Sequence, residues 1–239
     1  MKQIIASLLA TFGLSTMNKL IAAYLLAVGW FFVPVGQPAG GNLWFSLRLA
    51  LPALLLALGG LRLLPRLPAV AFFFCAVGDT MGVLGSFEGQ MGGFAVAHIC
   101  FICWFAKGLR RSKPRKVVLL ATALCCLLPL VVAAQSVLPG VQDVPIRVGC
   151  AVYALLLTGT LWTSVVRAFA VQKVLPFVAA TGALLFLVSD FILAWNKFTT
   201  HIPHASLYIM STYYAALLLL FLGLFNAGTP AAVASHVDR

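Results

Sequence analysis

The stretch VLPFVAATGALLFLVSDFILAWN, residues 174–196, decides the fold of this chain. It is almost wholly apolar, and about 20 such residues are enough to cross a bilayer as an α-helix. A single acid, Asp190, lies well inside it. A carboxyl group is costly at membrane depth, so its presence there indicates function rather than stability.

The rest of the chain has the same character. Of its 239 residues 62% are hydrophobic and 9% are charged, and the mean hydropathy is +1.06, too apolar for a soluble domain. We therefore predict an all-α fold, a polytopic membrane helical bundle of about eight transmembrane helices. The expected helices are residues 17–34, 43–61, 68–85, 91–109, 116–134, 145–165, 174–196 and 205–225.

Short connections between these helices leave no room for a separate soluble domain. We predict an N-terminal cytoplasmic or interfacial segment at 1–16, one membrane domain at 17–225 and a cytoplasmic tail at 226–239. The apolar run in the first segment, Ile4 to Leu14, is too short to span a membrane.

The charges predict the orientation. The chain has 16 Lys and Arg against five Asp and Glu, a net charge of +11, and the basic residues concentrate in the 107–116 loop and the other loops of that side. By the positive-inside rule, that loop and both termini are expected in the cytoplasm. Topology thus accounts for the charge without a nucleic-acid partner. For a bacterial protein, the predicted location is the cell inner membrane.

A second acid, Asp79, lies inside the third predicted helix. At about 1.5 Å per residue, Asp79, Asp190 and His98 each lie roughly 10 Å below the predicted outer surface. The paired tyrosines Tyr213 and Tyr214 reach the same level, and Arg48 lies slightly higher. This agreement across five helices predicts one polar cavity that opens outward.

Other interpretations of these residues remain open. The two aspartates could form ion pairs with Arg48 or His98, and Arg48 could extend outward to lipid headgroups. The pair Cys100 and Cys103 resembles a metal motif, but it stands in an apolar helix without a second pair, so we predict buried side chains and no metal site.

Three stretches of sequence resemble the YhhN-like lysoplasmalogenases, from about residue 51 to 223. They are AVGDTMGVLGSFEGQMGGFAVAHICF (76–101), GALLFLVSDFILAWNKF (182–198) and IMSTYYAA (209–216). The chain departs from the family pattern in two places. Ala215 and Ala216 follow the paired tyrosines where the family commonly has a Gln, and Phe101, three residues after His98, stands where it often has a Tyr. Both departures affect the hydrogen bonding expected around the substrate.

The resemblance implies an integral membrane hydrolase without a cofactor. It would cleave the vinyl ether of a lysoplasmalogen, a lysophospholipid, to a fatty aldehyde and glycerophosphocholine or glycerophosphoethanolamine. Asp79 and Asp190 match the positions proposed as catalytic. Substrate contacts are expected from His98, Tyr213, Tyr214, Ser189, Asn196 and Arg48, with Arg48, Arg147 and Lys197 as candidates for the phosphate. Membrane lipids are the other expected partners; the oligomeric state stays open.

The chemistry of vinyl ethers suits two carboxyl groups. Hydrolysis begins when an acid protonates the alkene carbon remote from oxygen, which gives an oxocarbenium ion that water then attacks. Glycosidases divide a similar task between a carboxylic acid and a carboxylate. Two alternatives remain: a proton-coupled transporter that uses the same carboxylates as a relay, or another membrane lipid hydrolase.

Overall fold

The structure is a computed structural model that describes residues 2–33, 43–112 and 114–225. Within them the chain forms eight α-helices and one 3₁₀ turn and no strand, which confirms the predicted all-α bundle. The elements are α1 (Lys2–Phe32), α2 (Leu43–Leu63), α3 (Arg66–Val83), α4 (Phe87–Ser112), α5 (Lys116–Ser136), η1 (Leu138–Gly140), α6 (Val144–Val171), α7 (Val174–Phe198) and α8 (Ala205–Leu224).

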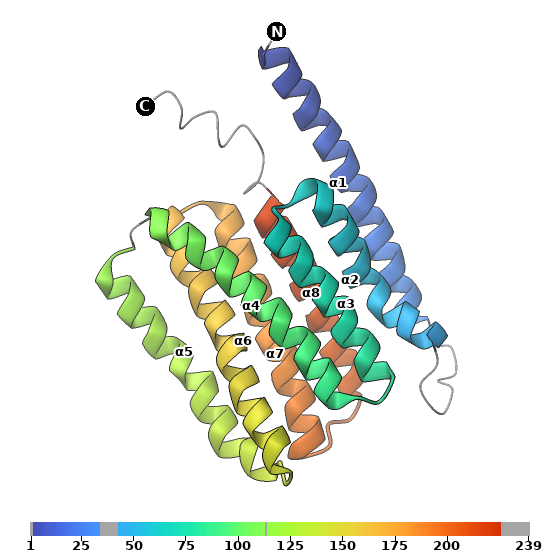
Figure 1. Cartoon of the computed structure of the whole chain (residues 1–239), viewed down its shortest axis with the longest axis vertical. Helices are drawn as coiled ribbons and strands as arrows, with labels where there is room; N and C mark the ends of the chain where they lie inside the picture. The colour runs from blue at the N-terminus through green and yellow to red at the C-terminus, as the bar shows by residue number, and fades with distance from the viewer. Residues whose placement is uncertain (1, 34–42, 113, 226–239) are drawn as a thin grey trace.

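The first helix differs most from prediction. It was expected to begin at residue 17 but begins at Lys2, so residues 2–16 continue it rather than form a separate segment, and Figure 1 shows its N-terminal part extending past the bundle. The sequence there contains no proline and mostly good helix formers, which lets the helix continue. The predicted tail at 226–239 lies outside the described residues.

Seven of the described helices, α2 to α8, are long and apolar enough to cross a membrane. The remaining one, α1, has Asn18 and Lys19 in the middle of its apolar sequence. Helices of this length and composition, in this number, are those of an integral, multi-pass membrane protein.

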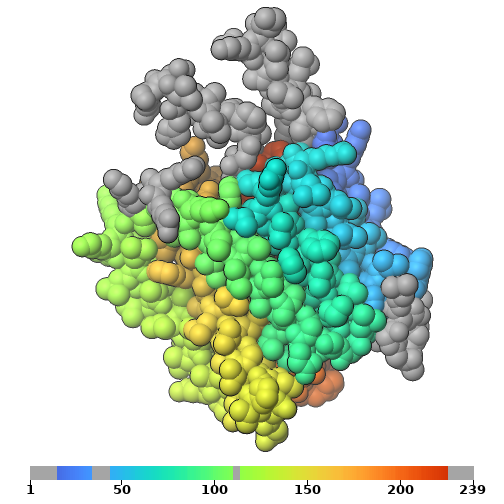
Figure 2. Space-filling view, viewed as in Figure 1, coloured from blue at the N-terminus to red at the C-terminus, as the bar shows by residue number. Residues whose placement is uncertain are grey.

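Six helices close into a ring. In order around it, α2 packs on α3, α3 on α4, α4 on α6, α6 on α7, α7 on α8, and α8 returns to α2. The other two helices are peripheral: α1 packs mainly on α2 and α5 mainly on α6. Figures 1 and 2 show them at opposite edges of the molecule. The buried core therefore lies inside the ring.

Glycines allow two helix pairs to approach closely. A Cβ added at Gly93 on α4 would lie 2.7 Å from the backbone nitrogen of Gly78 on α3, and one added at Gly182 on α7 would lie 2.7 Å from that of Leu220 on α8. Small residues let membrane helices pack where lipid supplies no hydrophobic driving force. The first contact fixes the backbone next to Asp79.

One of the chain's few acids has a purely local role. Asp143 precedes α6, and its Oδ1 accepts a hydrogen bond from the backbone N–H of Ile146 at 2.9 Å. This is an ordinary N-cap, which satisfies an amide that the helix cannot.

Candidate functional site

An apolar cavity lies between α4, α5, α6 and α7 at the end of the bundle where α6 begins and α7 ends. Its volume is about 100 Å³, large enough for several water molecules or part of a small ligand. Aromatic rings supply much of its wall, from Phe87, Phe94, Tyr153 and Phe191. Asp190 is the one acid among its lining residues.

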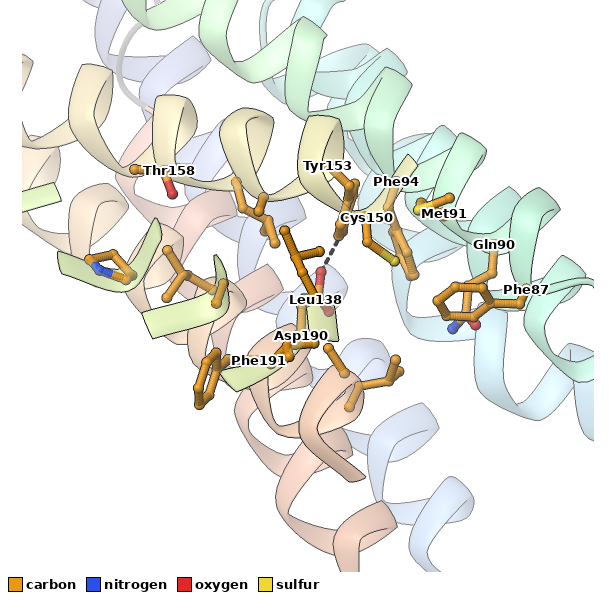
Figure 3. Close-up of a pocket in the computed structure, with 18 residues that line it drawn as sticks. Phe87, Gln90, Met91, Phe94, Leu138, Cys150, Tyr153, Thr158, Asp190 and Phe191 are labelled. Carbon is orange, nitrogen blue, oxygen red and sulfur yellow. Dashed lines mark hydrogen bonds between the residues drawn. The ribbon is translucent and has the colours of Figure 1, made fainter. Parts of the chain in front are cut away.

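Asp190 forms a hydrogen bond with a tyrosine across this cavity. Tyr153 on α6 donates its hydroxyl hydrogen to Oδ2 of Asp190 on α7, and Figure 3 shows the two side chains meeting at the cavity wall. Within the described part of the chain, Tyr153 is the one hydrogen-bond partner of Asp190. The bond orients the carboxyl group and leaves its second oxygen for another partner.

Asp79 occupies a more enclosed place. Its side chain is 3% exposed, and its Oδ2 accepts a hydrogen bond of 2.8 Å from the hydroxyl of Tyr213 on α8. Asp79 is not among the residues that line the cavity. The sequence predicted that both carboxyl groups face one cavity. In the structure Asp190 lies on the cavity wall, whereas Asp79 is buried inside the bundle.

An aromatic cluster lies between the two tyrosine–aspartate pairs. The rings of Phe94, Phe186 and Tyr213 contact one another edge to face, with centroids 5.4–5.8 Å apart. Phe94 also lines the cavity, so this cluster connects the surroundings of Asp79 with the cavity wall. Since apolar surroundings screen charge far less than water does, a charge on Asp79 acts on the cavity.

His98 also lies inside the ring, 1% exposed. Its Nδ1 is 3.0 Å from the Thr160 hydroxyl, and that hydroxyl donates to the carbonyl of Leu156 at 3.1 Å. When that hydroxyl donates to Leu156, Nδ1 carries the hydrogen of the neutral ring. Its Nε2 is buried without a partner in the described structure, and the ring stacks edge to face on Tyr153 with centroids 5.7 Å apart. His98 thus supports the tyrosine that holds Asp190.

Neither aspartate forms an ion pair with Arg48 or His98 in the described structure, so that interpretation was wrong. Arg48 is 2% exposed, and its Nη2 donates to the carbonyls of Trp30, Phe31 and Val33 at 2.5, 3.0 and 2.9 Å. These carbonyls lie at the C-terminal end of α1, where helix hydrogen bonds run out, although that of Trp30 also accepts from the backbone N–H of Val33 at 3.3 Å. Arg48 is thus engaged in joining α2 to α1 and does not line the cavity.

Three other predicted substrate contacts are also bound to backbone groups. Ser189 donates to the carbonyl of Ile209 at 2.9 Å, and Tyr214 donates to that of Leu49 at 3.0 Å. Asn196 accepts from the amide of Ile202 at 2.7 Å. Each of these three side chains thus has a hydrogen bond within the fold. A contact with the substrate stays a prediction for all three.

Among the predicted phosphate ligands, Lys197 lies nearest the cavity. Its ammonium nitrogen is 4.7 Å from the ring centroid of Phe87, which lines the cavity. Arg147 instead donates from Nε to the carbonyl of Val141 at 2.7 Å. Lys197 therefore places a positive charge beside a residue of the cavity wall, without lining the cavity itself, whereas Asp190 lies on the wall.

The sequence prediction missed Tyr153. The residue lies nine positions after the start of α6, about 13 Å into the membrane domain, close to the depth expected for the aspartates. Applying the depth calculation to every tyrosine, instead of to acids, histidine and the Tyr-Tyr pair, would have found it.

The fold and the site define a class: a multi-pass helical membrane protein with two tyrosine-bound carboxyl groups, one of them facing an apolar cavity. The chain belongs to the YhhN family, whose sequence profile matches residues 42–224 and so includes both aspartates and both tyrosines.

Its relatives include proteins named for an activity. The chain is 35% identical over 156 residues to human lysoplasmalogenase TMEM86B, a match covering 65% of this chain and 62% of the human protein. It is 32% identical over 220 residues to the mouse protein of the same name, covering 86% of each. It is 31% identical over 168 residues to bovine lysoplasmalogenase TMEM86A, covering 67% of this chain and 66% of the relative. The chain thus spans about three fifths of the human and rat TMEM86B proteins (62% and 56%). No solved structure matches it significantly.

Proposed function

We propose that this protein is a lysoplasmalogenase, which hydrolyses the vinyl ether of a lysoplasmalogen to a fatty aldehyde and a glycerophosphodiester. The observation that carries the proposal is the Asp190–Tyr153 pair on the wall of an apolar cavity. Relatives named lysoplasmalogenase that match most of the chain support the choice of substrate.

Asp190 is the proposed acid. Its proton moves to the alkene carbon remote from the ether oxygen, a C–H bond forms, and the substrate becomes an oxocarbenium ion. Tyr153, already donating to Oδ2, then stabilises the carboxylate left behind, since hydrogen bonds to an ionised acceptor are the stronger ones. Water adds to the cation and returns a proton to Asp190. The hemiacetal collapses to aldehyde and alcohol.

Asp79 is the proposed second carboxyl group. It acts through its charge, because it lies behind the aromatic cluster and not on the cavity wall. In this proposal Asp79 is ionised when the oxocarbenium ion forms and stabilises it, and the positive charge also faces the aromatic rings of the cavity. Lys197, beside the cavity wall, is proposed to hold the phosphate, while the apolar walls limit access of water to the cation.

The direct test is to incubate the purified protein in detergent with mixed lysolipids and identify the products by mass spectrometry. The proposal expects fatty aldehyde from lysoplasmalogens. Free fatty acid would instead identify another lipid hydrolase. Unchanged lipids, together with uptake into sealed vesicles that stops when the proton gradient is removed, would identify a transporter.

The role of Asp79 has its own test. Asp79→Asn keeps an oxygen for the Tyr213 hydroxyl and so preserves packing. Because the variant removes a charge that matters in the transition state, kcat should fall by at least about 10²-fold. A variant with wild-type kcat would leave Asp79 as a structural partner of Tyr213.

A further inference from the structure

A second hollow adjoins the Asp190 cavity along the inside of α5. It lies between α5, α6 and α7 and has a volume of about 740 Å³, within the range typical of ligand sites. Pro129, Leu187 and Phe191 line both spaces, so the two apolar spaces adjoin with these side chains at their boundary. We call the second hollow the α5 groove; its other walls include Thr122, Cys125, Leu161, Val165, Phe169 and Leu184.

One row of side chains on α6 lines first the cavity and then the groove. Tyr153 and Leu157 line the cavity, and Leu161, Val165 and Phe169 line the groove. These five residues are spaced by four, so each contacts the next along the helix and the row curves around α6 as it passes from the cavity to the groove. From Leu157 to Phe169 the row extends about 18 Å, close to the depth of one leaflet of hydrocarbon, half of the ≈30 Å core.

The α5 groove is open to the side of the bundle. It exists because α5 packs mainly on α6 and stands outside the ring. Groove residues on either side are well exposed, such as Leu128 at 66% and Leu184 at 45%. In a membrane this opening faces the hydrocarbon of the lipid.

The groove offers no polar group that a headgroup could use. Thr122 is its one hydroxyl, which donates to the carbonyl of Val118 at 2.6 Å and accepts from Nε1 of Trp162 at 3.2 Å. The occupant that matches this lining is a single hydrocarbon chain.

We propose that the α5 groove holds the alkenyl chain of the lysophospholipid and that the chain enters sideways from the membrane between α5 and α7. This inference rests on the proposed function, since it is the vinyl ether at the head of the chain that meets Asp190. A hydrocarbon chain gains little by leaving lipid for an apolar groove. The groove therefore acts by fixing how far the alkenyl chain slides along it, which places the vinyl ether at Asp190. The groove residues farthest from Asp190 determine the preferred length of the alkenyl chain.

Two exposed cysteines supply matched variants. Cys125 on α5 lines the groove, whereas Cys103 on α4 is exposed outside it. Cys125→Trp fills the middle of the groove, so a long chain can no longer pass while a short one still fits. Misplacing reacting atoms by about 1 Å can cost up to 10²-fold, so kcat/KM for the longest chains should fall by roughly 10- to 100-fold. Cys103→Trp should leave the whole chain-length profile unchanged.

Leu184→Trp, on the opposite wall of the groove, should likewise lower kcat/KM for the longest alkenyl chains. Thermal unfolding in detergent checks that each variant is folded. Equal profiles for Cys125→Trp and Cys103→Trp, or an equal loss at every chain length for both groove variants, would overturn the inference.

A non-hydrolysable 1-O-alkyl lysophospholipid with a photoreactive chain end tests the groove without any reaction. Its crosslinks should map to the α5 groove and decrease in Cys125→Trp. Crosslinks spread over all exposed helices would mean that only bulk lipid covers the groove. If crosslinks map to the groove but the wild type releases no aldehyde, the proposed function fails while the groove assignment stands.

Discussion

Replacing Asp190 by Asn removes the proposed catalytic proton but keeps the shape and the hydrogen bond of the side chain. The amide has nearly the same volume, and its oxygen can still accept the Tyr153 hydroxyl hydrogen, so the cavity wall should keep its shape. What disappears is the proton that Asp190 gives to the alkene carbon. General acid catalysis contributes about 10²–10⁴-fold, so the barrier should rise by about 3–5 kcal/mol, which appears in kcat.

The assay is aldehyde release from purified lysoplasmalogen in detergent, with initial rates measured across substrate concentration. Asp143→Asn is the matched control, because Asp143 caps α6 without lining the cavity and asparagine is an equally good N-cap. Its activity should equal that of the wild type. If Asp190→Asn unfolds at the wild-type temperature and releases aldehyde at a near-normal rate, Asp190 is not the acid.

Three further predictions concern charge and packing. Lys197→Gln should raise KM about fivefold without changing kcat, and the difference should shrink as salt is added, whereas Lys173→Gln at the other end of α7 should have no effect. An unchanged KM would exclude Lys197 as a phosphate ligand. Gly93→Ala should lower the free energy of unfolding by about 1–3 kcal/mol, measured by denaturation in detergent, because its Cβ would meet the backbone of α3. Gly92→Ala is the control, since nothing lies within 4 Å of an added Cβ there; equal stability of both variants would contradict the packing argument. Arg48→Gln should lower the free energy of unfolding by about 1–3 kcal/mol, because it removes charged donors from partly buried carbonyls, and should leave KM unchanged. A raised KM at wild-type stability would favour the predicted substrate contact instead.

The helical membrane bundle could be predicted because apolar runs of spanning length leave few other folds. The boundaries of α2 to α8 were predicted to within four residues except at the end of α6, which continues to Val171 where an end at residue 165 was predicted. The prediction failed at α1, where Asn18 and Lys19 look like the edge of the membrane in sequence but interrupt a continuous helix in the structure.

The sequence predicted how deep the site residues lie in the membrane, but not which neighbouring helices their side chains face. Counting residues along a helix gives the height of Asp79 and Asp190, but the side each one faces depends on which neighbours the ring supplies. Tyr213 draws Asp79 toward α8, while Tyr153 holds Asp190 against the cavity. Arg48 and Ser189 were predicted as substrate contacts because of their depth and their motif; in the structure each satisfies a carbonyl of a neighbouring helix.

The position of the cavity near one end of the bundle has a consequence for how the reaction finishes. Leu138 in the short 3₁₀ turn and Val137 just before it form part of its wall. The headgroup side of the cavity therefore lies close to water, while the groove side lies in hydrocarbon. Under the proposed reaction, the fatty aldehyde would dissolve in the oily phase and the glycerophosphodiester in the aqueous one. The two products would part into different solvents, which opposes their recombination and drives turnover forward without any further input of energy.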